Sequence, residues 1–463
     1  MKTDTVTFII LGATGDLTKR KLIPAIYNLV KDKKIKKFAI VGAARNKTKM
    51  TKILSLAKPY IKNINNKVWN RLTKSAHYYH LDFYQEEDYN VLGNVLSDIE
   101  KKCELSGNRV FYLAAAPQHF DKITLNLQKS KIAKQNTKRW VRVVYEKPFG
   151  WDLKSAKKIN KCISRVFKEK QVYRIDHYLG KELVGDIALM RFTNRILEPL
   201  WSKRDIHSIQ IIMDEDVGLE GRGDFYEHYG AFKDVVQNHA MQLLTLTTME
   251  APKSLRGEYL RKAKADILKQ VTIKDALFGQ YPGYKKIKGV AKNSKVNTFV
   301  ALHLQINNNR WRGVPIFIRA GKFLDKKETS IHIKFKKVHC LLSRTCPSDT
   351  NYFTIRIQPD DGFEFELNSK VPGVKNVVSP VKMDFCQGCR NQPNTPEAYE
   401  NLLEDVLKGD QSVFIRNDEI ENAWKIIDQV NVKRYKVYPY KKGSKGPKQL
   451  EQWSKKHNLQ WHS

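Results

Sequence analysis

The stretch VTFIILGATGDLT, residues 6–18, decides how the first part of the chain folds. Its first six residues form an apolar run that is typical of a buried strand, and residues 17–31 have the spacing of an amphipathic helix. Between them, Gly12 and Gly15 allow the backbone to turn tightly and to approach a pyrophosphate at the N-terminus of the helix. The spacing departs from the strict GxGxxG fingerprint, because the small residue Thr18 follows a GxxGxx pattern. We therefore predict a strand–turn–helix that binds a dinucleotide.

Further short apolar runs follow and alternate with amphipathic stretches. The predicted strands are residues 6–11, 38–42, 109–114, 141–145 and 172–175. The predicted helices are residues 17–31, 88–104, 123–131 and 153–168. This alternation is typical of βαβ units, in which helices cover both faces of a parallel sheet. We predict an α/β, Rossmann-like dinucleotide-binding domain over residues 1–175.

The pattern changes in the rest of the chain. Strand-like runs occur at residues 206–213, 297–306, 316–319, 330–336, 353–358 and 363–367. Several alternate apolar with polar residues, as in an antiparallel sheet with one covered face. Predicted helices at residues 229–249, 254–269 and 395–407 are available to cover that face. We predict a larger α+β domain with a mostly antiparallel sheet over residues 176–463, for substrate binding and dimerisation, although no Pro/Gly-rich linker marks its start.

Composition limits the class of protein. In 463 residues, 41% are hydrophobic, which excludes a disordered chain, and 83 basic residues against 48 acidic ones leave a net charge of +35. A nucleic-acid partner and a lysine-rich coding bias both explain the excess, and the scatter of the lysines favours the bias. An apolar run after Lys2 imitates a signal peptide, but it continues into the predicted turn. We expect a soluble, cytoplasmic protein with no membrane span and no specific nucleic acid.

The six cysteines do not form a disulfide framework in a chain of this length, and we predict reduced thiols. Cys386 and Cys389 have the CxxC spacing of a metal or redox site. Because the sequence holds no second CxxC to supply further ligands, we predict no metal site.

Arg45 follows the second predicted strand, where dinucleotide-binding proteins select their coenzyme. An acidic residue there holds the ribose hydroxyls of NAD, whereas an arginine accommodates the 2′-phosphate of NADP. The acid is missing here, so the position favours NADP over NAD. The alternative is one more surface cation in a basic protein.

Two further motifs follow predicted strands of the first domain. In EKPFG, residues 146–150, Lys147 lies at the carboxyl end of a strand, where open α/β sheets bind ligands. In RIDHYLGKE, residues 174–182, a helix that begins near Tyr178 would place His177 and Lys181 on one face of its first turn, as a phosphate-binding site. Asp176 as a simple helix cap explains the same residues equally well.

The second predicted domain contains two candidate segments. Residues 234–244 place Asp, Gln, Asn and His on a helix that is otherwise apolar, and such burial is costly unless the groups are hydrogen-bonded or used. His239 is the natural general base of this segment, although a lone helical histidine is more often structural. RAGK, residues 319–322, with Lys326 and Lys327 and with Gln358 on a later strand, suits substrate contact or an ordinary basic surface.

Together these motifs resemble the glucose-6-phosphate dehydrogenase family. The resemblance rests on segments that occur in the family's order and extend over nearly the whole chain: residues 12–17, 146–150, 174–182, 220–223, 234–239, 319–322 and 395–424.

The resemblance implies oxidation of β-D-glucose 6-phosphate to 6-phosphoglucono-1,5-lactone, the first step of the oxidative pentose phosphate pathway, with hydride transfer to NADP. By matched position, His239 is the general base and Asp176 orients it. The implied substrate-binding residues are Lys147, His177, Tyr178, Lys181, Glu215, Asp234, Lys322, Lys327 and Gln358. The implied coenzyme-binding residues are Gly12, Ala13, Thr14, Gly15, Asp16, Leu17, Thr18, Lys19, Arg45, Phe120 and Lys147. The family also suggests a homodimer or homotetramer.

Two alternative functions remain open at this point. A basic nucleic-acid-binding protein could retain a degenerate dehydrogenase fold, but the presence of Asp176, His177, Lys181 and His239 argues against decay. A related oxidoreductase could act on another sugar.

Overall fold

The computed structural model describes residues 3–219, 221–338, 351–374, 377–386 and 398–462. The chain divides into two compact units. Unit 1 comprises Met1–Lys181, Arg256–Arg261 and Pro396–Ile420, and unit 2 comprises Glu182–Leu255, Lys262–Thr395 and Glu421–Ser463. The domain limits drawn from the sequence pattern, 1–175 and 176–463, stay a prediction, since neither unit is continuous in sequence.

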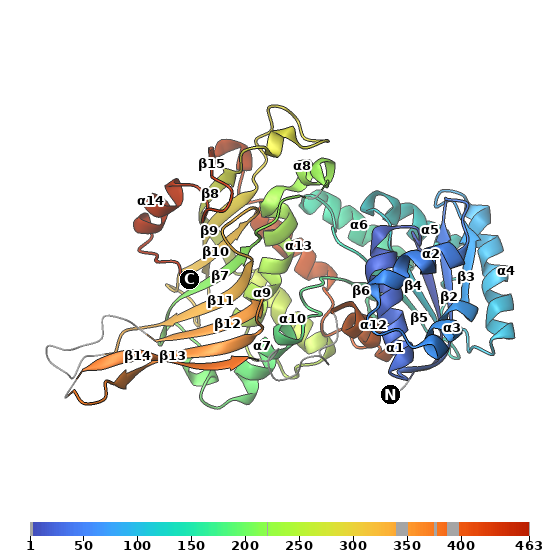
Figure 1. The fold of residues 1–463 in the computed structure, drawn as a ribbon, viewed down its shortest axis with the longest axis horizontal. Coiled ribbons are helices and arrows are strands. Elements are labelled where there is room, and N and C mark those ends of the chain that lie inside the picture. Colours follow the sequence, from blue (N-terminus) through green and yellow to red (C-terminus); the bar gives the residue numbers. More distant parts are fainter. Residues whose placement is uncertain (1–2, 220, 339–350, 375–376, 387–397, 463) are drawn as a thin grey trace. The chain divides into compact units, whose positions relative to one another are not determined.

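Unit 1 is built on a parallel sheet with the strand order β3-β2-β1-β4-β5-β6 (Figure 1). The strands are β1 (Thr3–Leu11), β2 (Ile35–Ala44), β3 (Ala76–His80), β4 (Arg109–Leu113), β5 (Val141–Tyr145) and β6 (Val172–Arg174). This order, which reverses between β1 and β4, is that of a Rossmann-type dinucleotide-binding sheet. The predicted fold of this part is confirmed, and β3 was not predicted.

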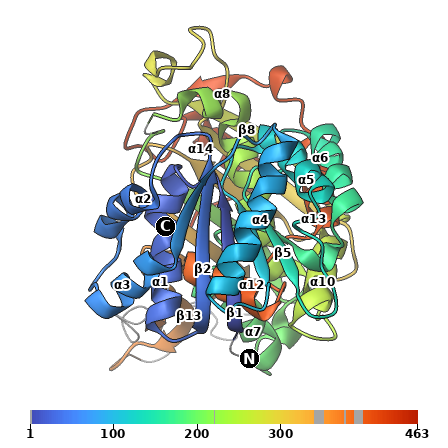
Figure 2. The same ribbon diagram turned by 90° about the vertical axis from the view of Figure 1, so that its right-hand side faces the viewer.

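Helices lie on both faces of the unit 1 sheet. Figure 2 shows α1, α2 and α3 on one side of β1 and β2, and α4 on the other. The helices are η1 (Thr18–Leu22), α1 (Ile23–Lys31), α2 (Met50–Ala57), η2 (Lys58–Tyr60), α3 (Asn66–Lys74), α4 (Glu86–Lys102), η3 (Pro117–His119), α5 (Phe120–Lys129), α6 (Leu153–Val166), η4 (Glu169–Gln171) and α12 (Ala398–Lys408). The predicted helix over residues 17–31 is a π-helical segment, η1, followed by α1.

Helix α12 corrects one prediction. The helix expected at residues 395–407 is present, but it does not cover the second sheet. Leu402, Leu403 and Val406 are buried in the hydrophobic core of unit 1, together with Val30 of α1. The apolar face of α1 is wider than the residues near it in sequence can bury, so a distant segment covers the remainder.

Unit 2 is built on a mixed sheet with the order β14-β13-β12-β11-β7-β10-β9-β8-β15. The strands are β7 (Ile206–Asp214), β8 (Val271–Gln280), β9 (Phe299–Ile306), β10 (Ile316–Gly321), β11 (Glu328–Phe335), β12 (Tyr352–Gln358), β13 (Gly362–Lys370), β14 (Val378–Cys386) and β15 (Val437–Pro439). The pairs β7–β10 and β8–β15 are parallel and the other pairs are antiparallel. The predicted mostly antiparallel sheet is confirmed, and β8, β14 and β15 were not predicted.

The helices of unit 2 differ from the sequence prediction at one helix, the one expected over residues 229–249. They are α7 (Glu182–Thr193), η5 (Glu198–Leu200), α8 (Gly223–Ala231), η6 (Phe232–Ala240), α9 (Met241–Thr248), η7 (Tyr284–Lys286), η8 (Val432–Arg434) and α14 (Gln449–Lys456), and α10 (Gly257–Leu268) and α13 (Asn417–Ile427) begin in unit 1. The predicted single helix over 229–249 comprises the end of α8, η6 and α9, and its backbone is broken at Gly230, which has φ 61° and ψ 178°. Asn297 caps the break by accepting hydrogen bonds from the backbone N–H groups of Ala231 and Phe232.

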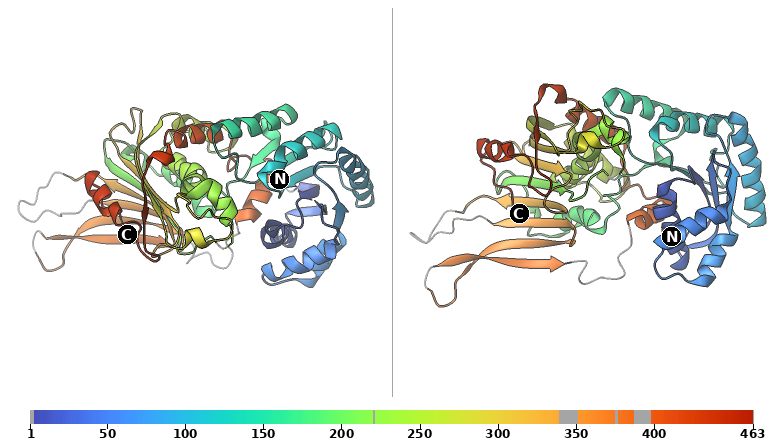
Figure 3. Two further views of the ribbon diagram at one scale, coloured as in Figure 1. Left: turned by 90° about the horizontal axis from the view of Figure 1, so that it is seen from above. Right: turned by 45° about the horizontal axis from the view of Figure 1, so that its top comes forward.

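The two faces of the unit 2 sheet are covered differently. Figure 3 shows the green helices of the α8–α9 region on one face and the dark red α14 on the other. On the α14 face, the ring of Trp453 packs edge-on against that of Phe317 of β10, with the ring centroids 6.1 Å apart. The chain end continues over this face, and the Gln210 side chain hydrogen-bonds to the Gln460 carbonyl and the His462 N–H.

The cysteines give a second correction. Cys103 and Cys162 are free, as predicted, but Cys386 at the end of β14 is disulfide-bonded. A count of cysteines in a long chain does not exclude a disulfide bond at one of them. Cys389 lies outside the described residues.

Candidate functional site

The glycine turn after β1 has the geometry that a bound pyrophosphate needs. Gly12 has φ +103°, and a Cβ built there would lie 2.3 Å from the carbonyl oxygen of Ala114. The N–H of Gly15 donates to the carbonyl of Gly12 at 2.9 Å, which closes the turn. Only glycine fits at position 12, so this backbone is open to close approach by a ligand.

The helix after this turn starts with a wide π-helical segment. Asp16 and Leu17 begin the helical backbone, and Thr18 and Lys19 lie in η1. The Thr18 side chain is fully buried, whereas the Asp16 carboxylate is exposed and pairs with Arg20 at 2.9 Å. Ala13 and Thr14 complete the turn. The residues present fit a dinucleotide phosphate at the N-terminus of this helix.

Arg45 and Phe120 lie at the same edge of the sheet but differ in exposure. Arg45 follows β2 directly and is exposed, so its guanidinium is available to a ligand. Phe120 is the first residue of α5, and its ring is fully buried against Tyr145, with the ring centroids 5.4 Å apart. The Phe120 side chain is therefore part of the core.

Lys147 follows β5 and is joined to Pro148 by a cis peptide bond. The preceding Glu146 carboxylate accepts hydrogen bonds from the hydroxyls of Tyr112 and Tyr399. Burial raises the pKa of Glu146, and the two tyrosines and Lys147 oppose that rise. The sequence motif identified only Lys147, but Glu146 is also part of the cluster of polar side chains at the end of β5.

The segment after β6 corrects the predicted helix near Tyr178. Residues 177–180 form consecutive turns, and α7 begins only at Glu182. Asp176, which is buried, accepts a hydrogen bond from the backbone N–H of Tyr178 at 2.9 Å and so fixes the first turn. Lys181 Nζ lies over the Tyr178 ring at 4.6 Å, and the His177 ring is 5.0 Å from the same ring. The turns, rather than a helix face, gather these side chains.

In unit 2, four predicted substrate residues lie at one edge of the sheet. Glu215 follows β7 and Lys322 follows β10, and these strands are parallel, so their carboxyl ends meet. Lys322, which is buried, pairs with Glu215 through Nζ and Oε2 at 2.7 Å. Lys327 precedes β11, which pairs antiparallel with β7, and Gln358 ends β12 and donates to Thr329 of β11 at 2.9 Å.

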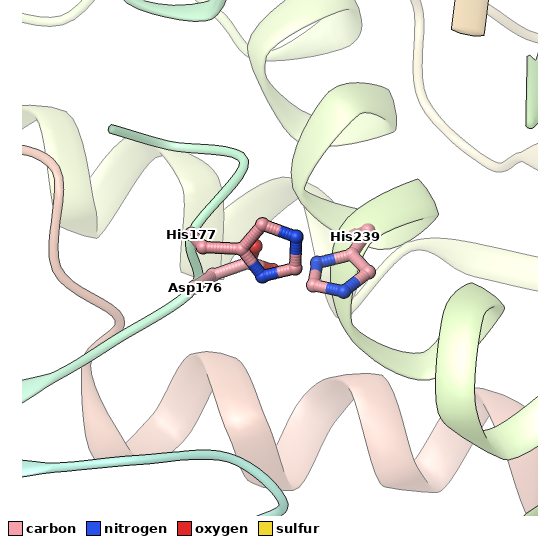
Figure 4. Close-up of side chains that lie close together, drawn as sticks. All are labelled: Asp176, His177 and His239. Atoms are coloured by element: carbon pink, nitrogen blue, oxygen red, sulfur yellow. The ribbon is translucent and has the colours of Figure 1, made fainter. Parts of the chain in front are cut away.

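The π-helix η6 carries the other two predicted residues of unit 2. It packs against β7 and β10, and Asp234 and His239 are both buried. π-helical segments are rare and are often found at functional sites. Figure 4 shows His239 on this helix, and Asp176 and His177 on the loop that follows β6.

Tyr226 is a residue at this edge that the sequence did not single out. It is fully buried on α8, and its ring lies 5.7 Å from Lys322 Nζ. Burial and then the charges of Asp234 and Glu215, among others, raise its pKa. A tyrosine in a short helix carries no sequence signal of this environment.

The Rossmann-type sheet with its glycine turn in one unit, and the ion pair and buried histidine carried by the other unit, define a dinucleotide-dependent oxidoreductase. Residues 9–186 match the model of the glucose-6-phosphate dehydrogenase NAD binding domain, and residues 188–462 match that of the C-terminal domain. The chain belongs to the glucose-6-phosphate dehydrogenase family.

Known relatives are similar over their full length. The glucose-6-phosphate 1-dehydrogenase of Chlamydia pneumoniae is 40% identical, over 98% of this chain and 95% of that protein. A solved glucose-6-phosphate dehydrogenase in complex with its substrate is 33% identical, with a TM-score of 0.91 and full coverage of both chains. The Mycobacterium avium enzyme is also 33% identical, with a TM-score of 0.86 and coverage of 100% and 99%.

None of the helices in the described part of the chain combines the length and apolar character that a membrane span requires.

Proposed function

We propose that this enzyme oxidises β-D-glucose 6-phosphate to 6-phosphoglucono-1,5-lactone with NADP as the coenzyme, as the first step of the oxidative pentose phosphate pathway. The observation that carries the proposal is the ion pair between the buried Lys322 and the half-buried Glu215, which follow the strands β10 and β7 against which the His239 helix packs. The solved relative with glucose 6-phosphate bound supports the substrate.

The coenzyme would be held by the glycine turn from Gly12 to Lys19, with Arg45 at the 2′-phosphate and Lys147 near the nicotinamide. NADP, when bound, supplies the hydride acceptor for C1 of the sugar. The exposed guanidinium of Arg45 suits a phosphate, since an arginine binds phosphate oxygens through two parallel hydrogen bonds. Phe120 contributes through its backbone, because its ring is buried.

His239 acts as the general base on the C1 hydroxyl. Its neutral imidazole takes the hydroxyl proton while the electrons of the C–H bond leave C1, so charge does not build up on the sugar. Asp176 orients the imidazole and stabilises its protonated form. Both side chains are buried, which excludes competing water from each of them.

The remaining residues bind the sugar phosphate. His177, Tyr178 and Lys181 bind the phosphate group, since the turns after Asp176 gather one cation and two hydrogen-bonding rings. Lys147, Glu215, Asp234, Lys322, Lys327 and Gln358 bind the sugar hydroxyls and orient C1. Oriented binding of this kind accounts for a large part of enzymatic rate enhancement.

The test is an initial-rate comparison of NADP and NAD with glucose 6-phosphate, glucose and other sugar phosphates, followed by the absorbance of the reduced nicotinamide. We expect NADP with glucose 6-phosphate to be the fastest pair. Absence of reduction with either coenzyme would contradict the proposal, and a faster rate with another sugar would replace the substrate.

Arg45→Ala tests the coenzyme assignment. The loss of a charged hydrogen bond predicts that NADP binds about 10–100-fold more weakly, with less than about a twofold change for NAD. Lys47→Ala, which removes an exposed cation two residues away, is the matched control. Equal losses for both coenzymes in Arg45→Ala would exclude recognition of the 2′-phosphate.

We further propose a homodimer or homotetramer and a cytoplasmic location. The second is supported by a 37% identical relative from Arabidopsis thaliana that is named as a cytoplasmic isoform. Light scattering of the purified protein measures the oligomeric state directly.

A further inference from the structure

His119 lies beside the proposed coenzyme site. In the unit 1 sheet, β2 and β4 flank β1, so the loops that follow these two strands stand on either side of the glycine turn. Arg45 follows β2, and His119 ends η3, which follows β4. Burial lowers the pKa of His119, and the charge of Arg45 lowers it further. Both therefore belong to one region of the sheet edge.

The His119 imidazole is held by aromatic neighbours from the loop after β3. Its Nδ1 atom is hydrogen-bonded to the hydroxyl of Tyr84 at 3.0 Å. The ring centroids of Phe83 and Tyr84 lie 5.5 Å and 5.7 Å from that of His119. Within the residues that the structure describes, Tyr84 is the one hydrogen-bond partner of this imidazole, which leaves Nε2 for a ligand. His119 itself is only partly buried, so a ligand can reach it.

We propose that His119 is a further coenzyme-recognition residue, whose Nε2 binds the 2′-phosphate of NADP beside Arg45 while Tyr84 positions the imidazole. The inference rests on the proposed function and deepens it. When the Tyr84 hydroxyl donates to Nδ1, the proton of the neutral imidazole is on Nε2, which then donates to a phosphate oxygen. In the imidazolium form, the Tyr84 oxygen accepts from Nδ1, and the positive charge strengthens the contact with phosphate.

This arrangement makes NADP binding depend on pH. The charged groups that face His119 are Arg45, which lowers its pKa, and Asp82, which raises it, and Tyr84 is its hydroxyl partner. A phosphate dianion beside the ring favours the imidazolium, so binding of NADP takes up a proton. Affinity for NADP therefore falls as the pH rises through the pKa of His119, whereas NAD, which lacks the phosphate, shows no such dependence.

The test measures dissociation constants of NADP and NAD by calorimetry on the full-length enzyme, at about pH 6.5 and about pH 8.5, on either side of most histidine pKa values. We expect His119→Ala to weaken NADP about tenfold at the lower pH and less at the higher pH, with less than about a twofold change for NAD. Gln118→Ala, an exposed residue of the same short helix, is the matched control and should leave both constants unchanged.

Tyr84→Phe tests the positioning role, because it removes the hydroxyl and retains the ring. We expect NADP to bind about threefold more weakly and the pH midpoint of its affinity to shift, with an unchanged thermal unfolding temperature. Unchanged NADP affinity in His119→Ala at both pH values, or equal weakening of NADP and NAD, would overturn the inference.

Failure of the inference is distinguishable from failure of the proposed function. If Arg45→Ala weakens NADP much more than NAD while His119→Ala leaves the affinity for NADP unchanged, the proposed coenzyme site stands and His119 is not part of it. If Arg45→Ala weakens both coenzymes equally, the site itself is wrong.

Discussion

The two sheets of this chain position functional residues by different rules. In unit 1 all paired strands are parallel, so every loop that follows a strand lies at one edge, and Gly12, Arg45, Lys147 and Asp176 reach that edge for this single reason. In unit 2 the strands run both ways, and Glu215 meets Lys322 only because β10 lies next to β7 and parallel to it. The first arrangement can be inferred from alternation in the sequence. The second depends on which strands are neighbours.

The largest expected effect is a loss of turnover, without a loss of coenzyme affinity, when the proposed base of unit 2 is replaced. His239→Asn removes the proposed general base, and we expect turnover to fall by about 10²–10⁴-fold. The affinity for NADP should stay within about twofold of wild type, since the glycine turn is untouched. His228→Asn, at an exposed position on α8, is the control. Near-normal turnover of His239→Asn in a steady-state assay would remove the base assignment.

The next effect tests whether α12 completes the core of unit 1. Leu402→Ala empties a fully buried position, and we expect a loss of about 2–5 kcal/mol in the free energy of unfolding. Hydrogen exchange should show reduced protection in β1 and α1 and unchanged protection in β9. Lys408→Ala, an exposed position of the same helix, should change the stability by less than about 0.5 kcal/mol. Loss of protection in β9 alone would place α12 elsewhere.

A smaller effect compares the two glycines of the turn. Gly12→Ala combines a positive φ with a Cβ 2.3 Å from a carbonyl oxygen, so we expect a loss of stability of about 1–3 kcal/mol and loss of NADP binding. At Gly15 the nearest contact of a Cβ is 3.1 Å, from the Gly12 oxygen, and the loss should be smaller. Thermal unfolding with and without NADP measures both. Equal losses at the two positions would contradict the assigned turn geometry.

The smallest effect concerns the chain end on the unit 2 sheet. Burial and then the nearby His332 lower the pKa of His462 to about 4, and its ring stacks on Tyr352. Because the folded pKa lies below the unfolded value of about 6.5, stability present above pH 6.5 is lost as the pH falls toward 4. The unfolding temperature of wild type should therefore fall between pH 6.5 and pH 4 by about 1–2 °C more than that of His462→Gln, which lacks the titrating imidazole. Parallel pH profiles for the two proteins would exclude the contribution.

The sequence predicted the parts of the fold that depend on local pattern. The strand at β5 has the predicted limits, and those at β1, β2 and β4 differ only at their ends, because a buried strand is a continuous apolar run. The position of α12 was not predictable in this way. An amphipathic helix shows that one face is buried, but it does not show against which partner.

The sequence predicted which residues belong to the candidate site, but it did not predict the backbone conformation that positions them. Motifs identified the residues around Asp176 and Lys181, but the turns that gather them replaced the predicted helix. The π-helical form of η6 has no simple sequence signal, since it differs from an α-helix only in that its backbone hydrogen bonds join residues five rather than four positions apart. The environments of Glu146 and Tyr226 arise from tertiary contacts that no short motif contains.

The return of α12 to the first unit has a consequence for synthesis of the protein. A nascent chain that has emerged only as far as residue 395 contains all six strands of the parallel sheet, yet it lacks the residues around Leu402 and Phe414 that close its core. The N-terminal unit must therefore wait for most of the polypeptide to leave the ribosome, with the apolar side of α1 uncovered in the meantime. Chaperones that bind exposed apolar helices have their longest opportunity to act on this chain during that interval.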